Sequence, residues 1–264
     1  MPHRPRKRFG QNFLHDPGVI ARIVAAVAPR PGEPLVEIGP GQGAITAPLL
    51  AAAGRLDALE LDRDLTVTLR ERFPPETGFR LHETDALRFP LCALQEADER
   101  LRLVGNLPYN ISTPLLFHLL DYRRCIADMH FMLQKEVVDR MAAVHGSRTY
   151  GRLSVMLQVH CRVTALFSIG PGAFRPAPKV DSAIVRLVPY VDPPWPVADA
   201  AHLYRLVAAA FGQRRKTLRN NLKGLVAPED FAAVGIDPGE RPEQLAPAQF
   251  VALANATCIH GSEP

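Results

Sequence analysis

The 264-residue sequence has only four cysteines and no long uninterrupted apolar run. The cysteines form no CxxC pair, and no histidine pair has the spacing of metal ligands, so we expect no metal site. No apolar stretch approaches the roughly 20 residues that a membrane-spanning helix needs. Thiols this far apart are typical of reduced, structural cysteines in a cytoplasmic protein without a membrane partner. They are Cys92, Cys125, Cys161 and Cys258.

The N-terminal segment partly imitates a secretory signal, because a basic start precedes an apolar stretch over residues 19–28. Arg22 interrupts this stretch, and its apolar residues recur at helical spacing: Ile20, Ile23, Val24 and Val27. The pattern favours an amphipathic helix that faces the core. We expect a mature N-terminus, with a mitochondrial presequence as the alternative.

Positive charge is concentrated in two short segments, although the net charge is only +4. Residues 1–10 and 211–223 contain no acidic residue, and the rest of the chain is net acidic. Two such segments indicate a polyanionic partner that binds at defined places, whereas solvated charge is the usual explanation for a single one. The basic residues are Arg4, Arg6, Lys7 and Arg8, then Arg214, Arg215, Lys216, Arg219 and Lys223.

The second basic segment also has helical spacing. Arg215, Arg219 and Lys223 recur every four residues, which predicts one helix face on which they repel one another. Bound phosphate would relieve that repulsion. The leucines of the same segment fall on another face and are predicted core residues: Leu218, Leu222 and Leu225.

Short β-rich runs alternate with helical stretches from residue 34, as in a parallel sheet covered by helices. Predicted strands span 35–38, 55–61, 79–83, 101–104 and 129–133, and predicted helices span 44–53, 63–72, 113–120 and 135–144. Two later runs, "LQVHCRVTALFSI" and "SAIVRLVPY", leave no room for a helix between them and predict an antiparallel hairpin. The segment "VPYVDPPWPVAD" breaks all periodicity, and only helical spacing follows it. We therefore predict an α/β domain over residues 1–189 and a small helical domain over 190–264.

Three predicted strand ends carry groups suited to an adenosine-containing ligand. The run "PLVEIGPGQG" places Gly39, Gly41 and Gly43 before a helix, where a ligand can approach bare backbone and free amides, although a plain tight turn also fits. The next strand ends at Glu60, which can accept both ribose hydroxyls, and the one after ends near Asp85, which can accept an adenine amine. Either acid taken singly is more simply a helix cap. Ligands of open α/β sheets bind outside these ends, so the three together predict such a cofactor.

The fourth predicted strand end carries "NLPY", residues Asn106, Leu107, Pro108 and Tyr109. The glycine spacing departs from G-x-G-x-x-G, which disfavours NAD and leaves S-adenosylmethionine. Pro108 removes a backbone donor and biases Leu107 away from helix, so that carbonyls of this turn can face outward. The Asn106 oxygen and a nearby carbonyl could accept the two hydrogens of an exocyclic amine, while Tyr109 stacks on the base. This arrangement predicts methylation of a base amine.

Six blocks occur in an order that resembles one family: "KRFGQNFL", "EIGPGQG", "VGNLPYNIS", "YGRLSVMLQ", "FRPAPKVDSAIVRL" and "FGQRRKTLRNNL". They are similar to ribosomal RNA adenine N6,N6-dimethyltransferases, in particular the bacterial small-subunit members, from about residue 6 to about residue 224. The resemblance implies an α/β, Rossmann-like class I methyltransferase with a mostly parallel seven-stranded sheet, a terminal antiparallel hairpin and a small all-α C-terminal domain. It also implies transfer of two methyls from S-adenosyl-L-methionine to each of two adjacent adenosines near the 3′ end of small-subunit rRNA.

The same resemblance suggests roles for single residues. Asn106, Leu107, Pro108 and Tyr109 become the catalytic tetrad, and Phe174 stacks on the other face of the target adenine, with a buried core phenylalanine as the alternative. Gln42 stands where a leucine is common, which leaves the shape of the methionine end open. The predicted cofactor-binding residues are Gln11, Asn12, Leu14, Gly39, Gly41, Glu60, Asp85 and Asn106. The predicted RNA-binding residues are Arg6, Lys7, Arg8, Arg214, Arg215, Lys216, Arg219 and Lys223.

These features predict a monomer that acts on rRNA within an immature small ribosomal subunit. A resistance methyltransferase for large-subunit rRNA shares the cofactor and tetrad motifs, but the blocks "FRPAPKVDSAIVRL" and "FGQRRKTLRNNL" favour the small-subunit enzyme. A non-catalytic RNA-binding or transcription factor on the same fold would not need an intact tetrad. A NAD-dependent oxidoreductase would need neither the tetrad nor two basic segments.

Overall fold

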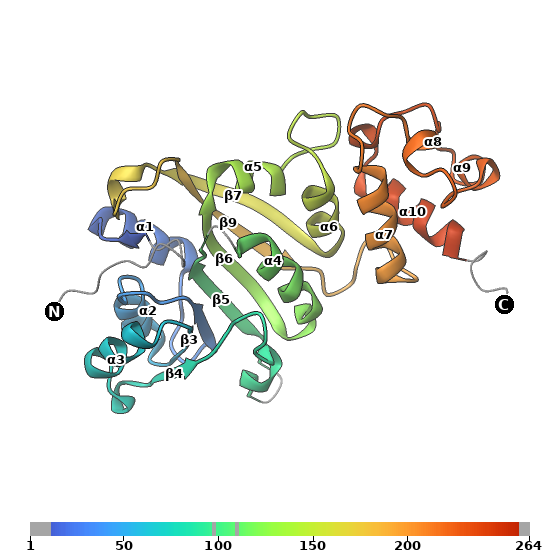
Figure 1. The fold of residues 1–264 in the computed structure, drawn as a ribbon. Coiled ribbons are helices and arrows are strands. Elements are labelled where there is room, and N and C mark those ends of the chain that lie inside the picture. Colours follow the sequence, from blue (N-terminus) through green and yellow to red (C-terminus); the bar gives the residue numbers. More distant parts are fainter. Residues whose placement is uncertain (1–11, 97–98, 109–110, 259–264) are drawn as a thin grey trace. The chain divides into compact units, whose positions relative to one another are not determined.

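The computed structural model describes residues 12–96, 99–108 and 111–258. Its main sheet has seven strands in the order β4-β3-β2-β5-β6-β9-β7 (Figure 1). These strands are Leu35–Ile38 (β2), Leu56–Glu60 (β3), Phe79–Glu83 (β4), Leu101–Asn106 (β5), Ile126–Gln134 (β6), Cys161–Ile169 (β7) and Ser182–Pro189 (β9). The strands from β4 to β6 in this order pair in parallel, whereas β9 pairs antiparallel with β6. A separate ribbon joins β1 (Phe13–Leu14) antiparallel to β8 (Phe174–Arg175).

Helices α1 (Pro17–Val27), α2 (Thr46–Ala53) and α3 (Arg63–Arg72) contribute to one hydrophobic cluster with one face of the sheet. Helix α4 (Ser112–Asp121) follows β5 and lies in front of β5 and β6 in Figure 1. The cluster joins Ile23, Val27, Leu49, Leu50 and Leu69 of the three helices to Leu35, Ala58, Val104, Met132 and Ile184 of the strands. Burial of such apolar area is the main stabilising term for the sheet that positions the site.

The N-terminal apolar stretch forms α1, as its helical spacing predicts. Asp16 begins the helix by accepting the Val19 N–H at 2.9 Å, and Pro17 stands in its first turn. Ile23 and Val27 are buried, while the rest of the stripe packs against the same cluster. In the part of the chain that the structure describes, no helix is both long and apolar enough to cross a membrane.

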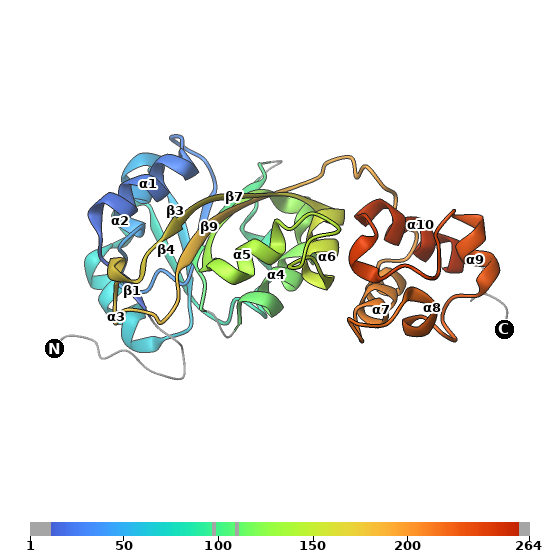
Figure 2. The same ribbon diagram turned by 90° about the horizontal axis from the view of Figure 1, so that it is seen from above.

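The predicted sheet class is confirmed, with two local corrections. Residues 157–160 belong to helix α6 (Arg152–His160), and the strand begins only at Cys161. Val155, Met156, Leu157 and Val159 of α6 are all buried, so the apolar run lacks the periodicity that separates a helix from a strand. The helix predicted over 135–144 ends earlier, as α5 (Lys135–Met141). Strands β7 and β9 lie side by side in both Figure 1 and Figure 2.

The chain divides into two compact units. One comprises Met1–Val138 with Thr164–Pro189, and the other comprises Asp139–Val163 with Tyr190–Pro264. The second unit contains α6, α7 (Ala200–Ala210), α8 (Leu218–Asn221), α9 (Pro228–Ala233) and α10 (Pro247–Cys258). The predicted boundary at 189/190 matches one point at which the chain passes from the first unit to the second. Residues 139–163, predicted to lie in the first domain, belong to the second unit, because α6 packs with α7 and α10. The two-domain assignment itself stays a prediction.

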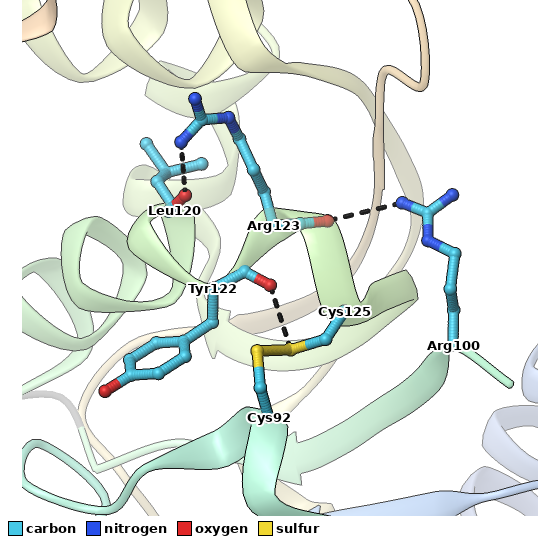
Figure 3. The surroundings of a disulfide bond; sticks show 6 residues. All are labelled: Cys92, Arg100, Leu120, Tyr122, Arg123 and Cys125. Atoms are coloured by element: carbon cyan, nitrogen blue, oxygen red, sulfur yellow. Dashed lines mark hydrogen bonds between the residues drawn. A yellow bond between two sulfur atoms is a disulfide. The ribbon is translucent and has the colours of Figure 1, made fainter. Parts of the chain in front are cut away.

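Two of the cysteines are not the reduced thiols that their separation suggests. Cys92 and Cys125 form a disulfide with a Cα–Cα distance of 5.6 Å, so the prediction of four free thiols is wrong for this pair (Figure 3). Cys125 ends the short helix η4 (Arg123–Cys125) directly before β6, and Cys92 lies in η3 (Leu91–Leu94), ahead of β5. Because β5 and β6 are parallel neighbours, their starting ends adjoin and bring together cysteines 33 positions apart. Cys161 and Cys258 take no part in this disulfide and remain thiols.

Candidate active site

Three neighbouring strands, β3, β2 and β5, end side by side at one edge of the sheet. Ile38 of β2 pairs with Leu59 of β3, and Glu37 pairs with Val104 of β5. The same register, extended to the residue after β2, places Gly39 between Glu60 and Asn106. The Gly39 N–H donates to the Leu59 carbonyl at 2.9 Å, and a β-carbon on Gly39 would lie 3.9 Å from the Asn106 carbonyl oxygen. The structure thus brings together the predicted glycine turn, ribose carboxylate and catalytic amide.

The turn after β2 requires glycine at specific positions. Gly41 and Gly43 have φ of +58° and +78°, a region that L side chains rarely adopt. A β-carbon on Gly43 would also lie 2.7 Å from the Phe73 ring, closer than such contacts allow. Arg72 of α3 donates to the Gln42 carbonyl at 2.6 Å and ties the turn to the helix. The backbone of this turn is therefore both bare and held in place.

Glu60 organises the backbone around the same edge. Its Oε1 accepts the N–H groups of Leu61 and Asp62, both at 2.9 Å, and its Oε2 accepts that of Gly41 at 3.2 Å. Burial raises the pKa of Glu60, while these backbone donors oppose the rise. Asp62, rather than Glu60, caps α3 by accepting the Asp64 N–H. A carboxylate has about four acceptor positions, so one remains on Oε2 for a ligand hydroxyl.

Glu37, in the middle of β2, is an acid of this region that the motif analysis missed. Its side chain is fully buried, and the Thr46 hydroxyl of α2 donates to its Oε2 at 2.6 Å. Burial raises the pKa of Glu37 to about 8, and the nearby Glu60 charge adds to the rise. Within the described residues, Oε1 of Glu37 has no hydrogen-bond partner. The sequence indicates this residue in one way, because it is an acid within the otherwise apolar strand "LVEI".

The predicted catalytic tetrad begins at the last residue of β5. Asn106 donates through Nδ2 to the Asn12 carbonyl oxygen at 3.1 Å. Because a carbonyl can only accept, this bond sets the orientation of the amide and leaves Oδ1 as the acceptor. Leu107 is buried and its N–H donates to the Met132 carbonyl at 3.1 Å, which anchors the turn, whereas Pro108 is half-buried. The tetrad therefore starts from a rigid strand end.

Asp85 lies in the loop that follows β4. Its Oδ1 accepts the Leu87 N–H at 3.0 Å, which closes a turn rather than caps an α-helix. The side chain is half-buried, and this bond uses Oδ1 alone. The carboxylate can thus hold its turn and accept another donor at once, and its role toward adenine stays a prediction.

The β1–β8 ribbon carries three further predicted residues. Asn12 directly precedes β1, and Leu14 pairs with Phe174 across the ribbon. The Phe174 side chain is 2% exposed inside the hydrophobic cluster, as a core phenylalanine would be, and has no face open to a base in this conformation. Its stacking role stays a prediction. The remaining predicted site residues lie outside the described residues: Arg6, Lys7, Arg8, Gln11 and Tyr109.

The second basic segment forms turns instead of the predicted helix. Helix α8 is limited to Leu218–Asn221, so Arg215 and Lys223 lie outside it and the predicted single face is wrong. The Asn221 amide holds the turn ahead of α8, because a side chain that bonds nearby carbonyls competes with helical hydrogen bonds there. Asn221 Nδ2 donates to the carbonyls of Ala210 at 2.7 Å, Gln213 at 3.1 Å and Lys216 at 3.4 Å.

The basic side chains of this segment share one environment. All are exposed, and in the described part of the chain none pairs with an acidic side chain: Arg214, Arg215, Lys216, Arg219 and Lys223. Gln213, Arg214, Arg215 and Lys216 line an open hollow of about 590 Å³. Leu218 and Leu222 are buried, as predicted. The segment thus presents uncompensated positive charge on a packed apolar base.

The strand order, the glycine turn after β2, the acid ending β3 and the amide-proline turn after β5 define a Rossmann-like methyltransferase. The family model for ribosomal RNA adenine dimethylase matches residues 2–257. The chain is 60% identical over 253 residues to ribosomal RNA small subunit methyltransferase A of Pseudomonas aeruginosa, covering 96% of this chain and 94% of that protein. Its identity to the Marinobacter nauticus protein of that name is 57%, with 96% and 91% covered. The chain belongs to the ribosomal RNA adenine dimethylase family.

Solved structures show the same fold. A dimethyladenosine transferase from Plasmodium falciparum superposes with a TM-score of 0.77 at 24% identity, covering 91% of this chain and 95% of that one. The 23S rRNA methyltransferase ErmE superposes with a TM-score of 0.72 at 24% identity, covering 94% and 100%. Since these two proteins share one fold but are named for different methyltransferases, the fold alone does not identify a substrate.

Proposed function

We propose that this chain transfers methyl groups from S-adenosyl-L-methionine to the N6 amines of two adjacent adenosines near the 3′ end of small-subunit rRNA, giving N6,N6-dimethyladenosines. The observation that carries this is the Asn106 amide, held by the Asn12 carbonyl so that its oxygen remains an acceptor. It ends the strand next to the glycine turn. The relatives named small-subunit methyltransferases support this substrate over large-subunit rRNA.

The polar and glycine residues at the ends of β2, β3 and β5, here called the strand-end row, fit S-adenosyl-L-methionine: Glu37, Gly39, Gly41, Glu60 and Asn106. When bound, this cofactor supplies a methyl group on an electrophilic sulfonium centre. The bare backbone of Gly39 and Gly41 can lie against it, and Glu60 keeps one acceptor position for a ribose hydroxyl. The unpartnered Oε1 of Glu37 adds a buried polar atom that a bound polar ligand can satisfy. Asp85 would accept from the adenine amine.

The tetrad then holds the target amine. Asn106 Oδ1 and a backbone carbonyl of the same turn would accept hydrogen bonds from its two N–H groups and orient the nitrogen lone pair. Positive charge develops on this nitrogen in the transition state, and preoriented acceptors stabilise it more than they stabilise the neutral amine. No strong base is needed, because the methylated ammonium is acidic and loses its proton to solvent. Tyr109 would stack on the base.

Exposed cations of residues 214–223 would contact rRNA phosphates. Such contacts position a substrate without reading its bases, which suits an enzyme that modifies two defined adenosines of one RNA. The same proposal places the protein in the cytoplasm, as a monomer that acts on an immature small ribosomal subunit.

A radiolabelled methyl-transfer assay tests this function. Unmethylated small subunits, naked small-subunit rRNA and large subunits serve as parallel substrates. We expect label in two adjacent dimethyladenosines of small subunits and little in large subunits. Preferred labelling of large subunits would favour the resistance enzyme, and no labelling by folded protein that binds the cofactor would favour a non-catalytic RNA-binding factor.

A further inference from the structure

The disulfide lies at the end of the sheet away from the strand-end row. Cys125 directly precedes β6, and Cys92 lies in the connection that leads into β5, whose far end carries Asn106. The disulfide therefore has no place in the proposed transfer chemistry. It closes a covalent loop that contains the whole of β5, the Asn106–Pro108 turn and α4.

The two sulfur atoms differ in access. Cys92 is exposed, whereas Cys125 is 3% exposed. The Sγ atom of Cys125 also lies 3.2 Å from the Tyr122 carbonyl oxygen (Figure 3). The Tyr122 carbonyl already accepts the Cys125 N–H at 3.0 Å. A disulfide sulfur carries no proton, so this carbonyl gains a second donor, the S–H group, only when Cys125 is a thiol. The buried sulfur thus has a partner in each state, namely Cys92 when oxidised and Tyr122 when reduced.

The backbone on both sides is held by contacts other than the S–S bond. Arg123 donates to the Leu120 carbonyl at 3.0 Å, and Arg100 donates to the Arg123 carbonyl at 3.2 Å, which together fix the η4 turn. On the other side, Leu91 of η3 is buried and anchors the helix that carries Cys92. Reduction would therefore leave the two cysteines facing each other, ready to pair again.

We propose that Cys92 and Cys125 form a reversible thiol–disulfide site that exchanges with small disulfides such as oxidised glutathione. In oxidation, the exposed Cys92 thiolate attacks the small disulfide and releases one thiol, which leaves a mixed disulfide on Cys92. Cys125, as a thiolate, then attacks the Cys92 sulfur and expels the second thiol, so that two protein thiols and one small disulfide become one protein disulfide and two small thiols. Reduction runs the same steps backward, with entry at Cys92 because Cys125 is buried.

Oxidation should stabilise the segment that carries the tetrad. A disulfide lowers the conformational entropy of the unfolded chain, and the stabilisation grows with the length of the closed loop. For a separation of 33 positions in a chain of this size, we expect a thermal midpoint about 5 °C or more higher in the oxidised protein.

The test equilibrates the full-length protein with glutathione buffers of graded ratio, approached from both the reduced and the oxidised side. Alkylation under denaturing conditions and peptide mass spectrometry then count free thiols, with Cys161 and Cys258 as internal references. We expect the fraction of Cys92–Cys125 disulfide to follow the ratio and to agree from both sides. Free thiols at every ratio, or a disulfide that no ratio reduces, would overturn the proposal.

Two variants complete the test. Cys92→Ser, at an exposed position, should lose the disulfide and keep the thermal midpoint of the reduced parent in every buffer. Cys258→Ser is the matched control and should exchange as the parent does. A redox-dependent midpoint that persists in Cys92→Ser, or equal midpoints for the oxidised and reduced parent, would contradict the role assigned to this pair.

Discussion

The strand-end row and the basic turns of residues 213–223 hold polar groups in opposite ways. In the row, Glu37 and Glu60 are buried. Backbone or hydroxyl donors fix these two carboxyl groups, and the Asn12 carbonyl, which accepts from Asn106, fixes the amide, all at 2.6–3.2 Å. In the basic turns, the charged groups are exposed and none pairs with an acid among the described residues. The Asn221 amide fixes the backbone, and the Arg214 guanidinium donates to the Arg148 carbonyl. The strand-end row therefore acts through the fixed positions of its polar atoms. The basic turns act through their positive electrostatic potential.

The difference determines which substitutions should matter. Where a group is buried and oriented, loss of a single atom leaves a donor or acceptor without a partner and changes the chemistry. Where cations are exposed and screened by salt, each contributes a similar small amount, and their number matters more than their position.

Asn106→Ala should give the largest effect. Removal of one oriented acceptor at the point where charge develops should lower methyl transfer at saturating substrate by about 100-fold or more, with little change in thermal midpoint. Single-turnover assays with labelled cofactor measure the step directly. Asn220→Ala, which removes an exposed asparagine of the basic turns, is the matched control and should keep the parental rate. A folded Asn106→Ala protein with near-normal turnover would remove the basis of the proposed mechanism.

Glu60→Gln tests the acid that ends β3, another member of the strand-end row. The amide keeps the size of the side chain but replaces one acceptor oxygen with a donor that faces backbone N–H groups. Loss of one or more charge-assisted bonds, at about 1.5–3 kcal/mol each, should weaken S-adenosylmethionine binding about 10- to 100-fold in calorimetry. Asp64→Asn, on the exposed first turn of α3, serves as the control. Unchanged affinity would mean that Glu60 only shapes the turn.

Glu37→Gln probes burial rather than ligand contact. The folded pKa of Glu37 is raised to about 8, so its contribution to stability is complete below the unfolded value of 4.5 and is lost as pH rises from 4.5 to 8. The variant should remove that slope, with a difference between parent and variant on the order of a few kcal/mol across the window. Urea unfolding at several pH values measures it. His130, with its pKa lowered by burial to about 4, destabilises both proteins equally below about pH 6.5 and cancels in the difference.

A parallel pH dependence of parent and Glu37→Gln would show that Glu37 is ionised in the fold. In that case Glu37 would carry a charge, as the exposed residues of the basic turns do. The difference between the strand-end row and the basic turns would then be smaller.

Arg215→Ala and Arg219→Ala should give the smallest single effects. Each removed phosphate contact should flatten the log–log dependence of small-subunit affinity on salt by about 1, and the double variant by about 2, while cofactor affinity stays unchanged. Arg30→Ala, which removes an exposed arginine of the first unit, is the control. If the slope and methylation rate of the double variant equal those of the parent, the basic turns carry solvated charge and rRNA docks elsewhere.

Periodicity and strand-end chemistry predict the first unit well. Strands β2 and β4 and helix α3 span the predicted residues, because their apolar patterns and flanking polar residues agree. Local patterns fail where distant contacts decide. Examples are α6, whose apolar residues are all buried, the turn that the Asn221 amide holds ahead of α8, and the cysteines brought together by adjacent strands. The motif analysis missed Glu37 because the role of this acid depends on its burial, which a sequence motif does not show.

The second unit is built from two separate stretches of chain, and this restricts how the protein can be recombined with its relatives. Helix α6 packs against α7 and α10, and the Gly146 N–H donates to the Glu243 carbonyl at 2.6 Å. A chimera that exchanges only residues 190–264 would pair a foreign α7 and α10 with the native α6 and mismatch a buried apolar surface. A transplant that carries residues 139–163 and 190–264 together keeps that surface intact. The second unit should therefore be exchanged between family members as two inserts, not as a C-terminal tail.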